Sequence, residues 1–422
     1  MAPGSSPAGA SANPAIRRAL VGLTITLVVA IGVVAGALAV SGGLVSSSAG
    51  PTPGPSGSAT ATVTASPSLP PTPEPSLGPT PEPTPVLVPS ALTGLPVTET
   101  AARRHPIAVM VDDLAAARPQ SGFNAAAIVW QAPAEGGIPR YMMIFQDQVP
   151  AKVGPVRSSR EYFIEWAAEW RAMYVHHGGS PQALSTLASH GSGQYVWNAD
   201  GFRWSPTYLY RVDHVTVPGG KTYPLVPPHN LYTDGSHLRK LAARIGADDG
   251  PLTPVWTFGA ASGPQDRPSG TTITVTYEPY ESIQYRYDPT TNTYRRYTAQ
   301  SGQAFKAQVD AGDGKPVAPT NVVILKMAFG PLNDGHYAQK HRLEAQDVGH
   351  GTAWISSNGI TVKGTWRKAS ITAPTLLFGP DGSPITLAPG QTFVQVMKLT
   401  DSVKLKAGTF PGASQVPSPL PS

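Results

Sequence analysis

The stretch AMYVHHGGSPQAL, residues 172–184, places two histidines, two glycines and a Ser-Pro pair after a short apolar run. These residue types suit a metal site, a catalytic pair, an anion-binding turn or a purely structural turn. Successive strand residues point to opposite faces, so His176 and His177 do not both face one site. Ser180 and Pro181 are residue types preferred at a helix N-cap and first helical position. We expect a strand, a glycine turn and a capped helix whose free N–H groups favour an anion; a capped connection without ligand fits equally well.

Further polar residues lie where other predicted strands end. Asp112 closes the first strand, a loop with Glu135 precedes Arg140, and segments 154–160 and 228–232 are rich in Arg, Ser, His and Asn. Loops that gather such side chains from one domain commonly form a polar binding cleft. The candidate ligand-binding residues are Asp112, Arg118, Ser121, Glu135, Arg140, Arg157, Ser158, Arg160, His176, Gly178, Gly179, Ser180, His229 and Asn230.

The same residues allow two kinds of chemistry. The catalytic candidates are Asp112, Glu135 and His176, since a carboxylate with a histidine, or two carboxylates, can serve as general acid and base. Polar loop residues more often bind a ligand or brace a loop than react, so binding is favoured over catalysis. The histidines lack H-x-x-x-H spacing and the chain has no cysteine, so we predict no metal site and no cofactor.

A predicted helix over residues 159–171 leads from one of these loops towards the histidine strand. Its aromatic side chains recur at helical spacing and indicate a core face, and Ser158 or Ser159 is the expected N-cap. Glu161, Glu165 and Glu169 recur every four residues on the other face. They indicate a solvated face, or else a contact with a cation or an amine.

The elements around these loops alternate between strand and helix. Short runs rich in Val, Ile and Tyr predict buried strands, which lie at 107–113, 126–133, 141–147 and 172–177. Two more helices are expected, one starting near Pro181 and one over residues 235–245. The pattern predicts an α/β N-terminal domain over residues 91–250.

From Pro251 the sequence changes to alternating large and polar side chains. The expected strands lie at 271–278, 282–288, 293–298, 322–329, 351–357, 360–366 and 392–399. Asn358-Gly359 is a strong hairpin signal, because both residues tolerate positive φ. We therefore predict a mostly antiparallel β domain over residues 255–410, α+β overall, and a disordered tail at 411–422.

The first ninety residues predict an anchor and a spacer. Residues 19–40 are uncharged and apolar, long enough to span a bilayer of about 30 Å as one helix, which we expect to remain uncleaved. Arg17-Arg18 precede it, so residues 1–18 are expected in the cytoplasm and the globular domains outside the cell membrane. Residues 41–90 are rich in Pro, Ser and Thr and predict a disordered linker.

The charge of the chain argues against one class of partner. The formal net charge is +5, and the longest basic clusters are pairs such as Arg295-Arg296. Nucleic-acid-binding proteins concentrate Lys and Arg in runs or along one helix. We therefore expect no nucleic-acid partner.

Three motifs in order resemble the YerB-like lipoprotein family, bacterial envelope proteins of unknown function. They are RHPIAVMVDDLAAARPQSGFNAAAIVWQAPAEGGIPRYMMIFQ, GPVRSSREYFIEWAAEWRAMYVHHGGSPQAL and PPHNLYT; GHGTAWISSNGITVKGTWRK and ITLAPGQTFVQVM are similar to the family's C-terminal domain. The resemblance covers about residues 92–400 and implies a two-domain extracytoplasmic protein without a catalytic assignment. The motif positions are Asp112, 118–122, 135–137, Arg140, 154–158, Arg160, His176, 178–182 and 229–232.

The chain departs from the family pattern in three ways. It has no cysteine for a lipid anchor, so a protein helix must serve as the anchor. Asp113 stands where an asparagine is expected, and His177 stands at a position expected to vary.

These features lead to a functional expectation and its alternatives. We expect a membrane-anchored extracytoplasmic envelope protein whose N-terminal domain binds a cell-wall polymer or an envelope protein through a polar cleft. The alternative is a hydrolase or transferase acting on wall glycan or phosphodiester, using Asp112 or Glu135 with His176. A purely structural scaffold for a partner protein is a third possibility, and the oligomeric state stays open.

Overall fold

A computed structural model describes residues 85–332, 335 and 340–411. The predicted membrane helix at 19–40, most of the linker and nearly all of the C-terminal tail lie outside these residues. No helix within the described ranges is long and apolar enough to cross a membrane.

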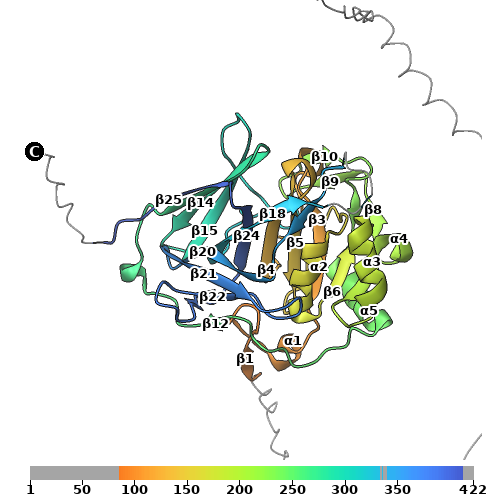
Figure 1. Cartoon of the computed structure of the whole chain (residues 1–422), viewed down its shortest axis with the longest axis horizontal. Helices are drawn as coiled ribbons and strands as arrows, with labels where there is room; N and C mark the ends of the chain where they lie inside the picture. Colours follow the sequence, from red (N-terminus) through yellow and green to blue (C-terminus); the bar gives the residue numbers. More distant parts are fainter. Residues whose placement is uncertain (1–84, 333–334, 336–339, 412–422) are drawn as a thin grey trace, which may run out of the picture. The chain divides into compact units, whose positions relative to one another are not determined.

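A ten-stranded sheet runs through the fold (Figure 1). Its strands, in spatial order, are β22 (Leu376–Phe378), β21 (Ile360–Lys368), β20 (Gly349–Ser357), β17 (Asn321–Met327), β24 (Thr392–Lys398), β4 (Ile128–Pro133), β5 (Pro139–Phe145), β3 (Ile107–Asp112), β6 (Met173–His176) and β7 (Trp197–Asp200).

The join between β24 and β4 connects the two segments that the sequence divides at about residue 250. The two strands run parallel, with Phe393 opposite Val129. The described residues accordingly belong to one compact unit. The α/β and β segments therefore share one continuous sheet.

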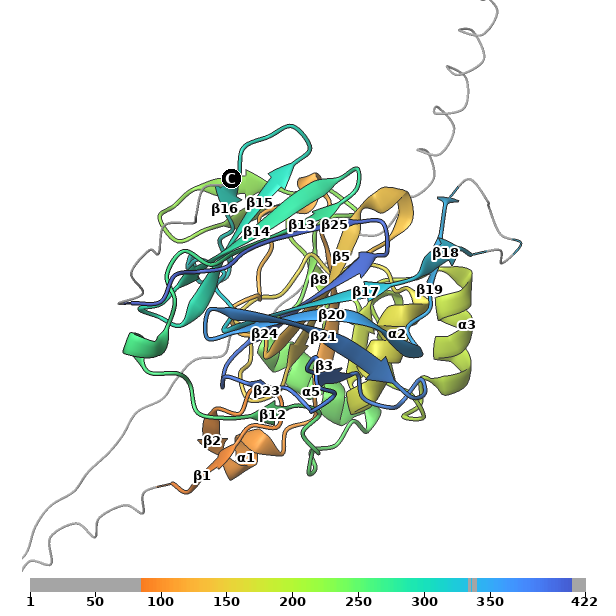
Figure 2. The ribbon, with the colours of Figure 1, turned by 60° about the vertical axis from the view of Figure 1, so that its left-hand side comes forward.

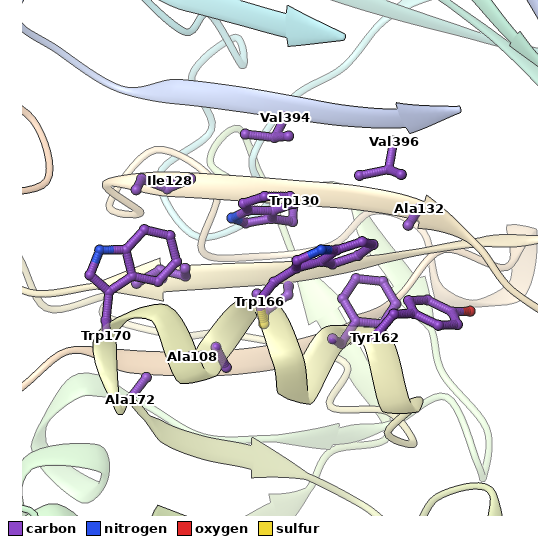
Figure 3. Packing of buried hydrophobic residues seen from close by; sticks show 14 of the residues in the cluster. Ala108, Ile128, Trp130, Ala132, Tyr162, Trp166, Trp170, Ala172, Val394 and Val396 are labelled. Atoms are coloured by element: carbon purple, nitrogen blue, oxygen red, sulfur yellow. The ribbon is translucent and has the colours of Figure 1, made fainter. Parts of the chain in front are cut away.

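Helices cover one face of this sheet over the strands that come from the N-terminal segment of the chain. They are α2 (Glu161–Ala167), its 3-10 extension η4 (Ala168–Trp170) and α3 (Pro181–His190). Trp130 of β4 stacks on Trp166 of α2 with ring centroids 4.8 Å apart and an interplanar angle of 14° (Figure 3). Val394 and Val396 of β24 lie in the same core, which therefore extends across the join.

The opposite face packs against α5 (Gly235–Ile245) and a second sheet. This five-stranded antiparallel sheet consists of β16 (Lys306–Ala307), β15 (Thr293–Gln300), β14 (Glu281–Asp288), β13 (Thr272–Tyr277) and β25 (Ser402–Lys406) (Figure 2). Alternation along β3 divides the cores, because Ala108 and Met110 belong to the core under α2 and α3, whereas Val109 and Val111 belong to the core shared with α5 and the second sheet.

Short elements complete the described fold. The two-stranded sheets pair β1 (Leu87–Pro89) with β2 (Pro96–Thr98), β8 (Tyr210–Arg211) with β11 (Leu231–Tyr232), β9 (His214–Thr216) with β10 (Thr222–Pro224), β12 (Thr257–Phe258) with β23 (Thr386–Leu387), and β18 (Phe329–Pro331) with β19 (Leu343–Ala345). The short helices are α1 (Glu99–Ala102), η2 (Ala115–Ala117), η3 (Glu135–Gly137), α4 (Gly201–Trp204) and η5 (Pro264–Asp266). Strand β1 lies inside the predicted linker, so the folded part begins a few residues earlier than residue 91.

Local signals in the sequence locate most elements correctly. Asn358 and Gly359, at φ 52° and 77°, form the hairpin between β20 and β21. The Ser180 hydroxyl accepts from the N–H of Ala183 and caps α3 at the expected residue. The expected cap of α2 is wrong: its N-cap is Arg160 without a side-chain bond, because the Ser159 hydroxyl bonds instead to the hydroxyl of Tyr174 at 2.9 Å.

The acidic face of α2 is covered rather than solvated. The carboxylate of Glu169 pairs with the Lys368 ammonium at 3.1 Å, and both side chains are fully buried. Glu161 accepts from the Thr186 hydroxyl of α3 at 2.6 Å. The amine contact is therefore the correct alternative for Glu169, since α3 and the segment after β21 cover this face.

Candidate functional site

The carboxyl ends of β3, β6 and β7 meet at one edge of the sheet. These three strands are parallel, whereas β5 runs antiparallel to β3 and places Arg140 opposite Asp112. Loops that follow parallel strands collect at such an edge, which is where α/β sheets bind ligands. Asp112 ends β3 and is the first site residue at this edge.

Asp112 is held by partners from two distant loops. Its Oδ2 accepts from Arg157 Nε at 2.9 Å and from His229 Nδ1 at 2.6 Å, while Oδ1 accepts from the N–H of Leu114 at 3.0 Å. The side chain of Asp112 is 5% exposed, but those of Arg157 and His229 are 25% and 11% exposed. Solvent and ligands therefore meet the guanidinium and the imidazole before the carboxylate.

Glu135 forms a second group with two arginines. Its carboxylate pairs with Arg140 at 3.3 Å and with Arg160. Burial alone would raise the pKa of Glu135, but the two guanidinium groups outweigh it and lower this pKa. Burial and the neighbouring Arg160 lower the pKa of Arg140 to about 10. Arg140 also donates to the Ser158 carbonyl at 3.1 Å, which links the two groups through the chain segment of Arg157.

We name these two groups together the edge cluster: Asp112, Glu135, Arg140, Arg157, Arg160 and His229. It contains three guanidinium groups and two carboxylates. Arg211 adds another cation beside it, because its exposed side chain donates to Asn230 Oδ1 at 2.7 Å and Asn230 adjoins His229. The edge cluster therefore has more positive than negative charge.

His176, on the neighbouring strand β6, has partners other than Asp112. Its ring is fully buried, with Nδ1 2.8 Å from the Gly178 carbonyl and Nε2 2.8 Å from Asn198 Oδ1. Both ring nitrogens are thus engaged within the protein. The histidine that the fold brings to Asp112 is His229, from the loop before β11.

The glycine turn adopts the expected conformation, and the N–H groups of Gly178 and Ser180 already have acceptors. Gly178 has φ 68°, and its N–H donates to Asp200 Oδ1 at 3.2 Å. The N–H of Ser180 donates to the Ser159 carbonyl at 3.3 Å, and Gly179 bridges to Ser159. The sequence favours an anionic ligand at this turn. In the structure, the carboxylate of Asp200 already accepts from the N–H of Gly178.

Arg118 belongs to a different set of residues, which we name the sealed network: Asp113, Arg118, Gln131, Glu281 and Arg296. Arg118 pairs with Asp113 at 2.7 Å and with Glu281 at 2.5 Å. The Gln131 amide donates to both carboxylates and accepts from Arg296 at 2.6 Å. Burial and the Glu281 carboxylate raise the pKa of Asp113. Two guanidinium groups face two carboxyl groups here, and the network braces the second sheet against β4.

Ser121 also lies apart from the edge cluster. It is fully buried and makes an antiparallel bridge with Gly154. Among the described residues, none bonds to its hydroxyl. Its position next to the loop that carries Arg157 is that of a packing residue.

Sequence reasoning missed the residues that complete both sets. Gln131 lies in the fully buried strand β4, whereas Glu281 and Arg296 lie on the buried phase of the alternating strands β14 and β15. A polar side chain on the buried phase of a strand is a usable signal, because it requires a partner. Asn198 and Arg211 carry no such signal, since their partners come from the tertiary fold.

Two pockets of the fold lie apart from the residues of the predicted polar cleft. A pocket of about 710 Å³ is lined by residues of β20, β21 and β22, such as His350, Arg367 and Phe378. Another of about 480 Å³ lies at the amino ends of the parallel strands, beside His105 and Arg171. Neither is lined by a predicted site residue. Among the described residues, no group of three or more histidine, aspartate or glutamate side chains is arranged to hold a metal ion.

The fold and the site define an α+β protein with a cationic edge cluster on a shared sheet. The chain belongs to the family described as "Protein of unknown function (DUF3048)", whose N-terminal domain matches residues 92–248 and whose C-terminal domain matches residues 273–394. The resemblance seen in the sequence motifs is thereby confirmed.

A relative and a solved structure extend this finding. The chain is 29% identical over 322 residues to "Putative lipoprotein YerB" of Bacillus subtilis (strain 168), covering 75% of this chain and 88% of that protein. It is also similar to the crystal structure of YerB protein from Bacillus subtilis, with a TM-score of 0.61, 27% identity, and coverage of 75% of this chain and 99% of that chain.

Proposed function

We propose that this protein is a membrane-anchored, extracytoplasmic envelope protein that binds an anionic cell-wall polymer at the edge cluster. The observation that carries the proposal is the charge imbalance of three guanidinium groups against two carboxylates, with Arg211 as a further cation. An anion at this edge offsets the unpaired positive charge and gains charge-assisted hydrogen bonds. Arg157 and Arg211 are the arginines through which an incoming anion makes first contact, because their side chains reach solvent.

The proposed location rests on the sequence. The apolar stretch 19–40 and the proline-rich residues after it suit a protein that is tethered to the membrane and works at a distance from it. A relative named as a lipoprotein supports an envelope location. Because this chain has no cysteine to carry a lipid, the apolar stretch 19–40 takes the role of the membrane anchor in this proposal.

Binding to purified cell-wall material tests the proposal. We expect the full-length chain to cosediment with the wall, and Arg157→Ala to reduce the bound fraction by about tenfold at physiological salt, as expected for a lost charge-assisted contact. Arg160→Ala is expected to weaken binding as well, because it removes one of the three guanidinium groups and leaves Glu135 with Arg140 alone. Arg295→Ala is the matched control, since Arg295 also pairs with a carboxylate but lies on β15. Equal binding by all four proteins contradicts the proposal.

A hydrolase is a second candidate because of one contact. Asp112 holds His229 through Nδ1 at 2.6 Å, an arrangement in which a carboxylate orients an imidazole for general-base chemistry at Nε2. His229 replaces His176 in this version, since both nitrogens of His176 are engaged. A release assay on wall glycan and phosphodiester polymers decides the matter: wild type must be active, and His229→Ala and Asp112→Asn inactive.

A further inference from the structure

An exposed aromatic side chain lies beside the edge cluster. Phe202 is 71% exposed, in the short helix α4 that Asp200 caps through the N–H of Phe202 itself. Its ring stacks on the ring of His177, with centroids 4.0 Å apart and an interplanar angle of 25°. The stack fixes the orientation of the Phe202 ring while one face stays open to solvent, so a ligand can pack on it.

Two glycines leave the room for this stack. A Cβ at Gly178 would lie 3.0 Å from the Phe202 ring, and a Cβ at Gly201 would lie 2.8 Å from His177 Nδ1. Gly178 is also in the left-handed region, at φ 68°. The glycine turn of the sequence therefore serves the aromatic pair, which we name the platform: Phe202 and His177.

The platform is attached to the arginines of the edge cluster. The N–H of His177 donates to the Arg157 carbonyl at 3.0 Å. Burial, followed by the charge of Arg211, lowers the pKa of His177, so its ring is neutral at neutral pH. The stacked phenyl and imidazole rings thus lie within electrostatic reach of two guanidinium groups, Arg157 and Arg211, and of the Asp200 carboxylate.

This combination matches the chemistry of an acidic sugar. One face of a pyranose ring presents C–H groups that pack on the electron-rich face of an aromatic ring. Its hydroxyls and a phosphate or carboxylate substituent lie at the rim, where arginines form charge-assisted hydrogen bonds. A sugar-free polyanion gains only the arginine contacts.

We propose that the polymer bound at the edge cluster is an acidic glycan, whose sugar ring packs on Phe202 and whose anionic group contacts Arg157 and Arg211. This inference rests on the proposed function, because it names the ligand class of the same site.

Titration of the full-length chain with two polymers of equal charge tests the inference. The polymers are a glycan with one phosphodiester per sugar, and inorganic polyphosphate. We expect Phe202→Ala to weaken binding of the glycan by about tenfold and to leave polyphosphate binding unchanged. Phe202→Tyr retains the ring and is expected to bind both polymers as wild type does. Phe410→Ala removes another exposed phenylalanine, 46% exposed, and serves as the control.

The outcomes separate the inference from the proposed function. Unchanged glycan binding by Phe202→Ala, together with a loss in Arg157→Ala, overturns the acidic glycan and retains the anion site. An equal loss for both polymers in Phe202→Ala also overturns the glycan, because the ring then acts on the arginines alone. If Arg157→Ala and Arg211→Ala bind both polymers as wild type does, the anion site itself fails. Thermal melting of each variant confirms that it is folded.

Discussion

Asp112 and Asp113 are neighbours in the sequence and belong to two different polar clusters. Asp112 lies in the edge cluster, with Arg157 and His229 as partly exposed partners. Asp113 lies in the sealed network, with Arg118 and Glu281, and its side chain has no exposed surface. Adjacent residues at the end of a strand point to opposite sides, which separates the two carboxylates.

The two clusters differ in charge balance as well as burial. The sealed network pairs two cations with two carboxylates, whereas the edge cluster has a surplus of guanidinium groups. A buried cluster must be balanced, because an unpaired charge inside the protein costs several kcal/mol. A cluster that reaches solvent tolerates a surplus and can use it to attract a ligand. Charge balance therefore distinguishes the bracing cluster from the binding one.

The largest expected effect comes from unbalancing the sealed network. Arg296 is 1% exposed and donates to Gln131 and to the Tyr285 hydroxyl. We expect Arg296→Met to lower the free energy of unfolding by about 3–5 kcal/mol, because it removes a buried cation and leaves the buried oxygens of Gln131 and Tyr285 without their donor. Urea denaturation of the full-length chain measures this loss. A change below about 1 kcal/mol would contradict the bracing role.

A smaller loss is expected at the buried pair of Glu169 and Lys368. Both side chains are fully buried, and the ammonium also donates to the Ile371 and Ala373 carbonyls. Lys368→Met is expected to destabilise the chain by about 2–4 kcal/mol.

The double variant Glu169→Gln/Lys368→Met supplies the control for that loss. It removes both charges and should recover part of the lost stability, as a double-mutant cycle in urea shows. If the losses of unfolding free energy in Glu169→Gln and Lys368→Met simply add up in the double variant, the two side chains are not coupled.

Glu165 and Asp347 form a third polar group, in which protonation of a carboxyl group limits the buried negative charge. Burial and the hydrogen bond to Glu165 raise the pKa of Asp347 to about 9. The unfolded value is about 3.9, so between pH 4 and 9 the folded chain holds a proton that the unfolded chain has lost. Stability from this group is therefore present below pH 4 and falls as the pH rises through this window.

Asp347→Asn tests that proton. The variant keeps a neutral side chain at every pH, so its unfolding free energy should fall less steeply between pH 5 and 9. The difference in slope is up to about 1.4 kcal/mol per pH unit for one proton. Urea denaturation at a series of pH values measures both slopes, and equal slopes would show that the pair ionises freely.

The smallest effect is expected at an exposed pair that belongs to neither cluster. Arg295 pairs with Asp288 at 3.4 Å, and its side chain is 53% exposed. We expect Arg295→Gln to change stability by less than about 0.5 kcal/mol and to leave polymer binding unchanged. A larger change in the melting temperature would mean that burial does not determine how much each charged pair contributes to stability.

Much of the fold follows from local signals in the sequence. Apolar runs predict the buried strands β3 and β17, and residue chemistry predicts the hairpin at Asn358-Gly359 and the cap at Ser180. These features depend on residues within about ten positions of one another. The pairing of β24 with β4 has no such signal, because periodicity specifies which face is buried but not which strand lies alongside.

The candidate site is predictable only in its composition. Arg, Asp, Glu and His at the ends of strands indicate a polar edge, and Asp112, Arg157 and His229 do converge there. The choice between His176 and His229 requires the tertiary fold, since His229 reaches Asp112 across 117 positions of the chain. The partner of Asp113 is likewise a glutamate of the second sheet, Glu281.

The salt dependence of binding tests the central claim most directly. Wild type and Arg157→Gln/Arg211→Gln are titrated with the phosphodiester glycan at several salt concentrations. If the surplus charge of the edge cluster binds the anion, wild-type affinity falls as salt rises, and the double variant shows both a weaker affinity and a shallower slope. Identical affinity and slope for the two proteins would contradict the claim that the edge cluster is the binding site.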